Sequence, residues 1–257
     1  MSAQLSDFDL TGKRALVTGG GDGLGRQLAE ALVDAGAEVV ICGRRYDPLA
    51  QTAGELGPGV TPVRADVTDQ RDVERLVSEA GHIDILVNNA GLAHRAPWNE
   101  VTSQDWRWIM SLNVESPFWL IQALAPAMIQ QGWGRIINVS SIYGLVGGDH
   151  GKYPGQGINI ASYFASKHAL IGLTKFLAVE FARSGVTVNA LCPGMFPSPA
   201  NIKVLEPEVI AALQEGTPVG RLGTDRDLRT AVLFLAAPGS GFVTGHSLVV
   251  DGGWTIW

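Results

Sequence analysis

A tyrosine and a lysine four residues apart, Tyr163 and Lys167, are the side chains best suited to proton transfer in this sequence. They open an apolar, periodic segment, residues 163–182, whose pattern predicts a buried helix. Because residues four apart share one face of a helix, the phenol and the ammonium are expected to lie one turn apart. A nearby ammonium favours the ionised form of a phenol, whose reference pKa is about 10. The pair could therefore exchange a proton near neutral pH, although a helix can also carry such a pair by chance.

A glycine-rich turn, TGGGDGLG at residues 18–25, follows a short apolar run and precedes a helical pattern that ends at Gly36. Glycines at such a turn let the backbone approach a pyrophosphate, whose charge is favoured at a helix N-terminus. The spacing is T-G-x-x-x-G-x-G, with Gly19, Gly23 and Gly25 as its fixed points, and not G-x-G-x-x-G. We interpret the turn as a dinucleotide-binding site; the alternative is a turn that packs closely for structural reasons alone.

The end of the second predicted strand indicates which dinucleotide is bound. A carboxylate there would bind the adenosine ribose hydroxyls of NAD, whereas arginine suits the 2′-phosphate of NADP. The sequence reads Gly43-Arg44-Arg45, and the first acid after it is Asp47. Guanidinium groups match phosphate in geometry and in charge. The sequence therefore predicts a preference for NADP(H), with NAD(H) as the alternative, unless the two arginines are only a solvated surface pair.

Short apolar runs alternate with helical patterns along the chain. Strands are expected at residues 14–18, 38–42, 60–65, 83–87, 135–139, 187–191 and 247–250, and helices at 24–35, 69–80, 103–131 and 163–182. Pro117 and Pro126 are expected to kink or break the helix at 103–131. Repeated β-α units form a parallel sheet with helices on both faces. The predicted fold class is therefore α/β, a doubly wound parallel sheet of the Rossmann type with about seven strands, in a single domain spanning residues 1–257.

The bulk composition limits the classes of partner. The 257 residues are 46% hydrophobic and 17% charged, and the net charge of -6 argues against nucleic acid or an anionic membrane as the main partner. No apolar stretch approaches the roughly 18 residues of a membrane-spanning helix. Cys42 and Cys192 fit neither a metal-binding spacing nor a disulfide framework, so no metal site is expected. We expect a cytoplasmic enzyme with a small-molecule substrate.

Six motifs follow one another along the chain: Thr18-Gly19-x-x-x-Gly23-x-Gly25, Asn88-Asn89-Ala90-Gly91, Asn113, Ser141, Tyr163-x-x-x-Lys167 and Pro193-Gly194. With them the sequence resembles the short-chain dehydrogenase/reductase family over essentially its whole length. The resemblance implies that Tyr163 is the general acid in reduction and the general base in oxidation. It implies that Lys167 lowers the pKa of the tyrosine and holds the nicotinamide ribose. It also implies that Ser141 hydrogen-bonds the substrate oxygen and stabilises the charge that develops there.

By the same resemblance, Asn113 would anchor a water that connects Lys167 to solvent. The alternative is an asparagine that hydrogen-bonds the backbone of its own helix. Ser140 precedes Ser141, but strand alternation lets only one of two neighbours reach the site, and the family's serine matches Ser141. A second tyrosine, Tyr153, has no lysine four residues further along.

The resemblance also implies which residues bind the cofactor. Asp66 and Val67 match positions that contact adenine, and residues 88–91 match the segment that lies along the cofactor. Where many relatives have a threonine after the Pro-Gly pair, this chain reads MFPS at 195–198, and Ser198 offers a hydroxyl of its own. The predicted cofactor-binding residues are Gly19, Gly21, Asp22, Gly23, Leu24, Gly25, Arg44, Arg45, Asp66, Val67, Asn89, Ala90, Gly91, Tyr163, Lys167, Pro193, Gly194, Phe196 and Ser198.

Ser141 and Tyr163 are 22 positions apart, more than in most family members, and the excess falls in a loop at residues 147–157. This loop is a candidate wall of the substrate pocket, and the alternative is a surface excursion or a subunit contact. The side chains that it could supply are Asp149, His150, Lys152 and Tyr153.

Two further segments are expected near the substrate. Residues 195–216 match the mobile lid that covers substrate in the family. His94, Arg95 and Trp98 follow the fourth predicted strand and are expected to line the mouth of the pocket, with packing as the alternative for Trp98.

The opening run FDLTGK at 8–13 and the closing run GHSLVVDGG at 245–253 resemble the branch that contains sugar-acid, polyol and 3-oxoacyl reductases. We therefore predict an NADP(H)-preferring oxidoreductase that interconverts a ketone and a secondary alcohol, on a sugar acid, a polyol or a similar small carbonyl compound. A 3-oxoacyl-thioester (acyl-carrier-protein) reductase is the alternative, weakened by the acidic charge balance because a carrier protein prefers a basic docking face. A non-catalytic dinucleotide-sensing regulator is disfavoured because the Tyr/Lys pair and the serine are all present. The resemblance also implies a homotetramer, assembled through residues 103–131, 161–183 and the C-terminal strand.

Overall fold

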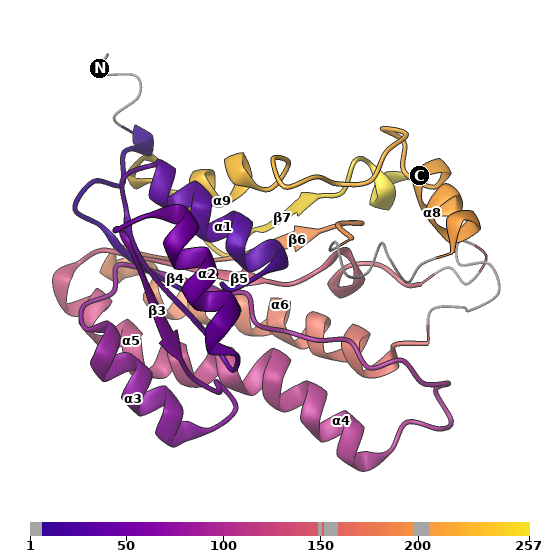
Figure 1. Ribbon diagram of the computed structural model, residues 1–257, viewed down its shortest axis with the longest axis horizontal. Helices are drawn as coiled ribbons and strands as arrows, with labels where there is room; N and C mark the ends of the chain where they lie inside the picture. The colour runs from indigo at the N-terminus through magenta and orange to yellow at the C-terminus, as the bar shows by residue number, and fades with distance from the viewer. Residues whose placement is uncertain (1–6, 149–150, 152–158, 198–205) are drawn as a thin grey trace.

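The computed structural model describes residues 7–148, 151, 159–197 and 206–257. Seven strands form one sheet in which every neighbouring pair is parallel, in the order β3-β2-β1-β4-β5-β6-β7 (Figure 1). The strands are β1 (Arg14–Thr18), β2 (Glu38–Gly43), β3 (Val60–Arg64), β4 (Ile85–Asn88), β5 (Gly134–Val139), β6 (Val186–Pro193) and β7 (Ser247–Val250). The chain runs outward from β1 to β3, crosses back to β4 and continues outward to β7. The predicted α/β fold with a doubly wound parallel sheet is confirmed.

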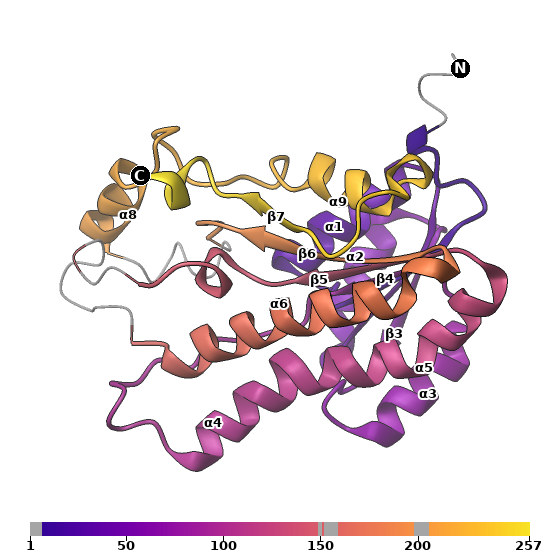
Figure 2. The same ribbon diagram turned by 180° about the vertical axis from the view of Figure 1, so that it is seen from behind.

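Helices cover both faces of the sheet (Figures 1 and 2). One face carries α1 (Gly23–Asp34), α2 (Tyr46–Leu56) and α9 (Arg229–Ala236), and the other carries α3 (Gln70–Ala80), α4 (Ser103–Met110), α5 (Ser116–Gln131) and α6 (Ala161–Phe181). A further helix, α8 (Pro207–Glu215), packs against Trp254, which follows β7. Within the described part of the chain, no helix is both long and apolar enough to cross a membrane.

Alternate residues of the central strands enter two separate cores, as expected for strands that are covered on both faces. In β1, Val17 is buried in the core beneath α1 and α9, whereas Leu16 is buried in the core that contains α3 and α5 residues. In β2, Ile41 and Val40 divide in the same way. The register is therefore strongly specified, because a slip of one residue would exchange the side chains of the two cores.

The predicted helix at 103–131 is continuous but not uniform, because five π-helical residues, Ser111–Glu115, join α4 to α5. The expected break at the prolines does not occur. Pro117 lies in the first turn of α5, directly after the π-helical segment, where the regular hydrogen-bond ladder is already interrupted. Pro126 lies inside α5. The π-helical segment has a consequence for the site, since it contains Asn113.

Among the described residues, three α-helices have no counterpart in the expected elements: α2, α8 and α9. In α2 only Leu49 and Thr52 are buried, so its apolar stripe is too thin to stand out in the sequence. In α9 the run AVLFLA at 231–236 is apolar without interruption, which leaves no helical period to detect. The expected strands agree with the observed ones to within two residues at each end.

Because all seven strands are parallel, their carboxyl ends meet at one edge of the sheet, where α/β proteins bind their ligands. The glycine-rich turn follows β1, the segment 88–91 begins at the last residue of β4, and Ser140 and Ser141 follow β5. Pro193 ends β6. The sheet therefore gathers motifs that are far apart in the sequence along a single edge.

Candidate active site

Tyr163 and Lys167 lie on consecutive turns at the N-terminal end of α6. Lys167 is only 4% exposed, and its Nζ donates a 2.8 Å hydrogen bond to the backbone oxygen of Val139 at the end of β5. The same Nζ lies 5.5 Å from the centre of the Tyr163 ring. The ammonium group of Lys167 is thus held against the end of β5 and lies beside the tyrosine ring.

Ser140 and Ser141 point to different partners, as strand alternation requires. The Ser140 hydroxyl donates a 3.0 Å hydrogen bond to the backbone oxygen of Lys167, so it ties β5 to α6. The Ser141 hydroxyl accepts a 3.2 Å hydrogen bond from the backbone N–H of Tyr143, and it also hydrogen-bonds the Tyr163 side chain. The geometry therefore places Ser141, and not Ser140, against the Tyr163 hydroxyl.

Asn113 does not hydrogen-bond its own helix. Its Oδ1 accepts a 3.0 Å hydrogen bond from the backbone N–H of Leu92, and its Nδ2 donates to the Leu92 backbone oxygen at 2.9 Å and to the Ser166 hydroxyl at 3.0 Å. The π-helical segment presents this fully buried amide to the segment after β4 and to α6 at once. Asn113 therefore links the two elements that flank Lys167, and the bound water that the resemblance implies stays a prediction.

Gly91 brings the segment after β4 against this cluster. A Cβ atom at that position would lie 3.2 Å from Oδ1 of Asn113 and 3.3 Å from Nζ of Lys167. Such distances are tighter than ordinary van der Waals contacts, so a side chain here would push against both groups. Glycine is favoured at position 91 by this close approach and not by its backbone conformation.

Burial dominates the acid–base properties of the pair. Burial raises the pKa of Tyr163, against a smaller lowering by the hydrogen bond from Ser141. Burial lowers the pKa of Lys167 to about 8. The net shift at Tyr163 is opposite to the one expected from the Tyr/Lys spacing, because desolvation of the phenolate outweighs any attraction by the ammonium. In this arrangement Tyr163 is a phenol at neutral pH and so is ready to donate a proton.

A cleft of about 500 Å³ opens along the carboxyl ends of β1, β2 and β3, beside the buried lysine. This volume is in the range of pockets that hold small molecules and cofactors. Its walls come from the glycine-rich turn, from the ends of β2 and β3 and from the segment after β4. The lining residues are Gly19, Gly21, Asp22, Gly43, Arg44, Arg45, Pro48, Leu49, Ala65, Asp66, Val67, Thr68, Ala90, Gly91, Leu92, Trp108 and Leu112.

The glycine-rich turn leaves its backbone open to the cleft. Gly19 and Gly23 have positive φ angles of 66° and 51°, which other residues rarely adopt. A Cβ atom at Gly25 would lie 2.1 Å from the backbone oxygen of Gly19, so Gly25 lets the helix pack directly on the turn. Asn89, which follows β4, stabilises the turn, because its Nδ2 donates a 2.8 Å hydrogen bond to the Thr18 backbone oxygen. Bare backbone at the N-terminus of α1 fits a pyrophosphate.

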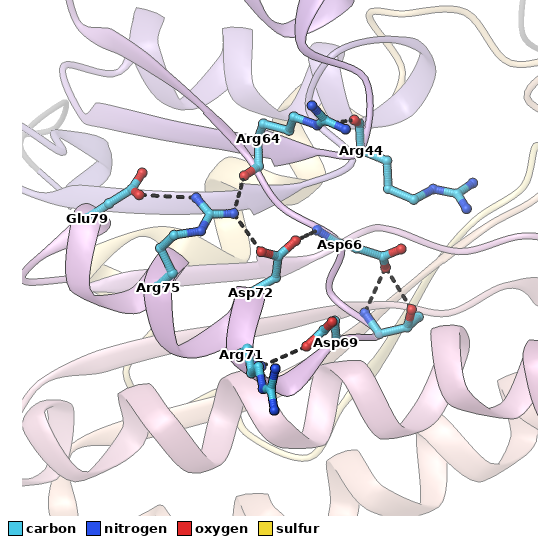
Figure 3. Close-up of polar contacts among 9 residues, drawn as sticks. Arg44, Arg64, Asp66, Asp69, Arg71, Asp72, Arg75 and Glu79 are labelled. Carbon is cyan, nitrogen blue, oxygen red and sulfur yellow. Dashed lines mark hydrogen bonds and ion pairs between the residues drawn. The ribbon is translucent and has the colours of Figure 1, made fainter.

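The far end of the cleft is held by a chain of polar contacts between β2, β3 and α3 (Figure 3). The Asp66 carboxylate accepts hydrogen bonds from the backbone N–H and the hydroxyl of Thr68, and the Asp66 N–H donates to Asp72 at 2.8 Å. Asp72 in turn forms an ion pair with Arg75. This network shapes the turn at Asp66 and Val67 that the resemblance assigns to adenine. Sequence reasoning missed Asp72 and Arg75, although an acid in the first turn of a helix is a common partner for a preceding loop.

Several other predicted residues lie outside the cleft. Phe196 packs its ring against Gly223 and lines a smaller cavity of about 210 Å³, and Gly194 packs against Asp251. Gly23, Leu24, Gly25, Asn89, Tyr163, Lys167, Pro193 and Gly194 are not among the residues that line the larger cleft. Ser198, Asp149, His150, Lys152 and Tyr153 lie outside the described residues.

Of the residues expected at the mouth of the pocket, Trp98 lines a cavity of about 210 Å³ together with Ala161 and Phe164 of α6. Trp98 is 82% exposed, so it does not pack into the interior of the subunit. His94 Nε2 lies 3.7 Å from a carboxylate oxygen of Asp105 in α4. Arg95 makes no hydrogen bond or ion pair within the described part of the chain.

The residues present fit a nicotinamide dinucleotide: a glycine turn at a helix N-terminus, a cleft of suitable volume and arginines at its far end. Together with the tyrosine, lysine and serine at the near end, they define an NAD(P)-dependent oxidoreductase that acts on an alcohol or a carbonyl group. A family model described as short chain dehydrogenase matches residues 13–208. The chain belongs to this family.

Individual relatives are similar over nearly their whole length. A galactitol 2-dehydrogenase (L-tagatose-forming) of Cereibacter sphaeroides is 38% identical, covering 97% of this chain and 98% of the relative. A 3-oxoacyl-(acyl-carrier-protein) reductase of Rickettsia prowazekii (strain Madrid E) is 36% identical, covering 96% of this chain and 98% of the relative. A gluconate 5-dehydrogenase from Burkholderia cenocepacia J2315 has a crystal structure in complex with NADP and tartrate. Its sequence is 36% identical, and the structural match covers 98% of both chains with a TM-score of 0.88.

Replacing Tyr163 by phenylalanine removes only the phenol oxygen from a partly buried ring. We expect Tyr163→Phe to lower kcat by about 10²- to 10⁴-fold, the range for loss of a general acid. Binding of NADPH, followed by the fluorescence of the reduced nicotinamide, should change by less than about twofold, because the tyrosine does not line the cleft. Turnover that persists in Tyr163→Phe would remove this residue from the chemistry.

Lys167 should make the stability of the free protein depend on pH. Because its folded pKa is lowered to about 8 from 10.5, the unfolded chain holds more protons between these values, and the free energy of unfolding rises with pH across that window. The rise should amount to about 3 kcal/mol at most. The Lys167→Met variant lacks this titrating group. The stability of the variant relative to wild type should therefore be highest below pH 8 and should fall toward pH 10.5.

Urea unfolding of both proteins at intervals from pH 7 to pH 10 measures this difference. Comparing the two proteins at each pH cancels the titration of all other groups. Lys175→Met, which removes an exposed lysine of the same helix, gives the baseline. A stability difference between Lys167→Met and wild type that stays constant with pH would contradict the buried-charge account.

Proposed function

We propose that this chain is an NADP(H)-preferring dehydrogenase that interconverts a ketone and a secondary alcohol on a sugar acid, a polyol or a similar small carbonyl compound. The observation that carries the proposal is the contact between Ser141 and Tyr163 above a buried Lys167, at the end of a dinucleotide-sized cleft. Burying an ammonium is costly, and a protein that only senses the dinucleotide would gain nothing from that burial.

In the direction of reduction, Tyr163 donates its phenolic proton to the carbonyl oxygen of the substrate. Ser141, which already hydrogen-bonds the tyrosine, donates to the same oxygen and stabilises the charge that develops on it. Lys167, with a pKa of about 8, is mostly an ammonium at neutral pH and favours the phenolate that remains. The nicotinamide cofactor supplies or accepts the hydride when bound. Asn113 then provides the route by which a proton returns from solvent, through the water that the resemblance implies.

The preference for NADP(H) rests on the end of β2. The guanidinium of Arg44 lines the cleft and has no hydrogen-bond or ion-pair partner among the described residues. The first carboxylate after the strand, Asp47, belongs to the first turn of α2 and does not line the cleft. A free guanidinium at this end favours a 2′-phosphate over ribose hydroxyls. The complex of a related gluconate 5-dehydrogenase with NADP supports this assignment.

A 3-oxoacyl-thioester reductase is the second candidate, because similar proteins carry that name. The net charge of -6 weighs against it, since an acidic carrier protein is attracted to a basic surface. Sugar acids and polyols are favoured by the named galactitol and gluconate dehydrogenases.

The assembly, the cytoplasmic location, the single domain and the lid at 195–216 stay predictions. A homotetramer would cover the exposed apolar side chains of α5 and α6. These are Phe118, Ile129, Phe176 and Val179.

A panel of substrates tests the reaction class. We expect cofactor-coupled turnover with sugar acids or polyols and their keto forms, at a kcat/KM at least about tenfold above that for 3-oxoacyl thioesters. Absorbance of the reduced nicotinamide at fixed cofactor concentration measures both directions. Higher kcat/KM for the thioesters would replace the first candidate by the second, and binding of NADPH with no turnover on any member would favour a sensor.

Changing the free arginine tests the cofactor preference. Wild type should have the higher kcat/KM with NADPH, and Arg44→Asp should lower it by about 10²-fold, because a charge-assisted contact is lost and a like charge is introduced. The kcat/KM with NADH should change far less. Arg183→Asp, the same charge change at an exposed arginine before β6, serves as the control. A wild-type enzyme that strongly favours NADH would overturn the preference.

A further inference from the structure

The two arginines at the end of β2 are not equivalent. Arg44 has its backbone oxygen held by Nε of Arg64 at 3.2 Å, while its own guanidinium is unpaired among the described residues (Figure 3). Arg45 is already engaged: its Nη2 lies 2.6 Å from Oδ2 of Asp22, in the glycine-rich turn. All three of Asp22, Arg44 and Arg45 line the same cleft.

Asp22 makes this contact in place of the usual capping hydrogen bond to its own helix. It stands at the N-cap position of α1, where an aspartate usually accepts a hydrogen bond from the first-turn backbone. Its side chain accepts no such bond. Its carboxylate instead reaches across the mouth of the cleft to Arg45, so the pair joins the phosphate-binding turn to the adenosine end.

The ion pair has opposite consequences for the two dinucleotides. A 2′-phosphate must compete with the Asp22 carboxylate for Arg45, and it then lies near a like charge. A ribose without that phosphate is neutral and meets neither obstacle. Both side chains are about 70% exposed, at 69% for Asp22 and 74% for Arg45, so solvent weakens the pair and a phosphate can displace it.

We propose that Asp22 is a specificity-determining residue that restrains the preference for the 2′-phosphorylated cofactor by occupying Arg45. The inference rests on the proposed function in one respect, the placement of the adenosine ribose beside Arg44 and Arg45. In this arrangement Arg44 provides the attraction for the phosphate, and Asp22 sets how far that attraction exceeds the affinity for the unphosphorylated ribose.

Calorimetric binding of two fragments tests this directly, because adenosine 2′,5′-bisphosphate and AMP differ only by the 2′-phosphate. Asp22→Asn should bind the bisphosphate about three- to tenfold more tightly than wild type, since an exposed ion pair and a like-charge contact are removed. Its affinity for AMP should stay within about twofold. Unchanged or weaker binding of the bisphosphate would overturn the proposal.

Glu55→Gln is the matched control. Glu55 forms an ion pair with Arg26 at the same 2.6 Å, and neither residue lines the cleft. The control makes the same change of net charge as Asp22→Asn. Because it makes this change outside the cleft, it should leave the affinity for both fragments unchanged. A gain equal to that of Asp22→Asn would show a long-range charge effect and would overturn a specific role for Asp22.

The Arg45→Gln background separates competition for Arg45 from other effects. There, Asp22→Asn should give a clearly smaller gain in affinity for the bisphosphate, because the guanidinium that the carboxylate occupied is gone. An equal gain in both backgrounds would overturn the proposed competition. Failure of the proposed function looks different: a wild type that binds AMP more tightly than the bisphosphate refutes the NADP preference, while the direction of the Asp22→Asn change still decides the role of Asp22.

Discussion

A positive charge buried at the carboxyl edge of the sheet is the constraint on which the rest of the site depends. The ammonium of Lys167 is almost excluded from water, and its hydrogen bond goes to a backbone oxygen, that of Val139. No carboxylate of the described residues forms an ion pair with it, and the fall of its pKa to about 8 expresses the desolvation that remains uncompensated. Under the proposed function, this buried charge favours the phenolate that Tyr163 forms when it gives up its proton.

The fold supplies the rigidity that such a burial requires. Three segments that are distant in the sequence meet at Lys167: the end of β5 through Val139, the segment after β4 through Gly91, and the π-helical residue Asn113. Parallel strands place the first two along one edge, and the two cores on either side of the sheet hold them in register. The π-helical turn then presents Asn113 toward two elements at once, the segment after β4 and α6.

The order of strands and helices and the grouping of the motifs could be predicted from sequence because both follow from local patterns. Apolar runs mark strands that are covered on both faces, and parallel topology brings their ends together. Tertiary effects could not be predicted in this way. The helix α2 buries too few residues to show a period, the raised pKa of Tyr163 depends on how deeply α6 packs, and the Asp22–Arg45 pair joins residues 23 positions apart.

The two ends of the cleft differ in how strongly a single charge acts. At the end proposed for the reaction, burial disfavours the charged forms of both Tyr163 and Lys167. At the end proposed for the adenosine, Asp22, Arg44 and Arg45 lie on exposed turns where solvent screens each charge. Different elements hold the two ends: α6 and β5 carry the proposed catalytic residues, and the β1–α1 and β2–α2 turns carry the charges proposed to face the adenosine. Under the proposed function, surface charges can therefore change the cofactor preference without altering the proposed proton-transfer geometry.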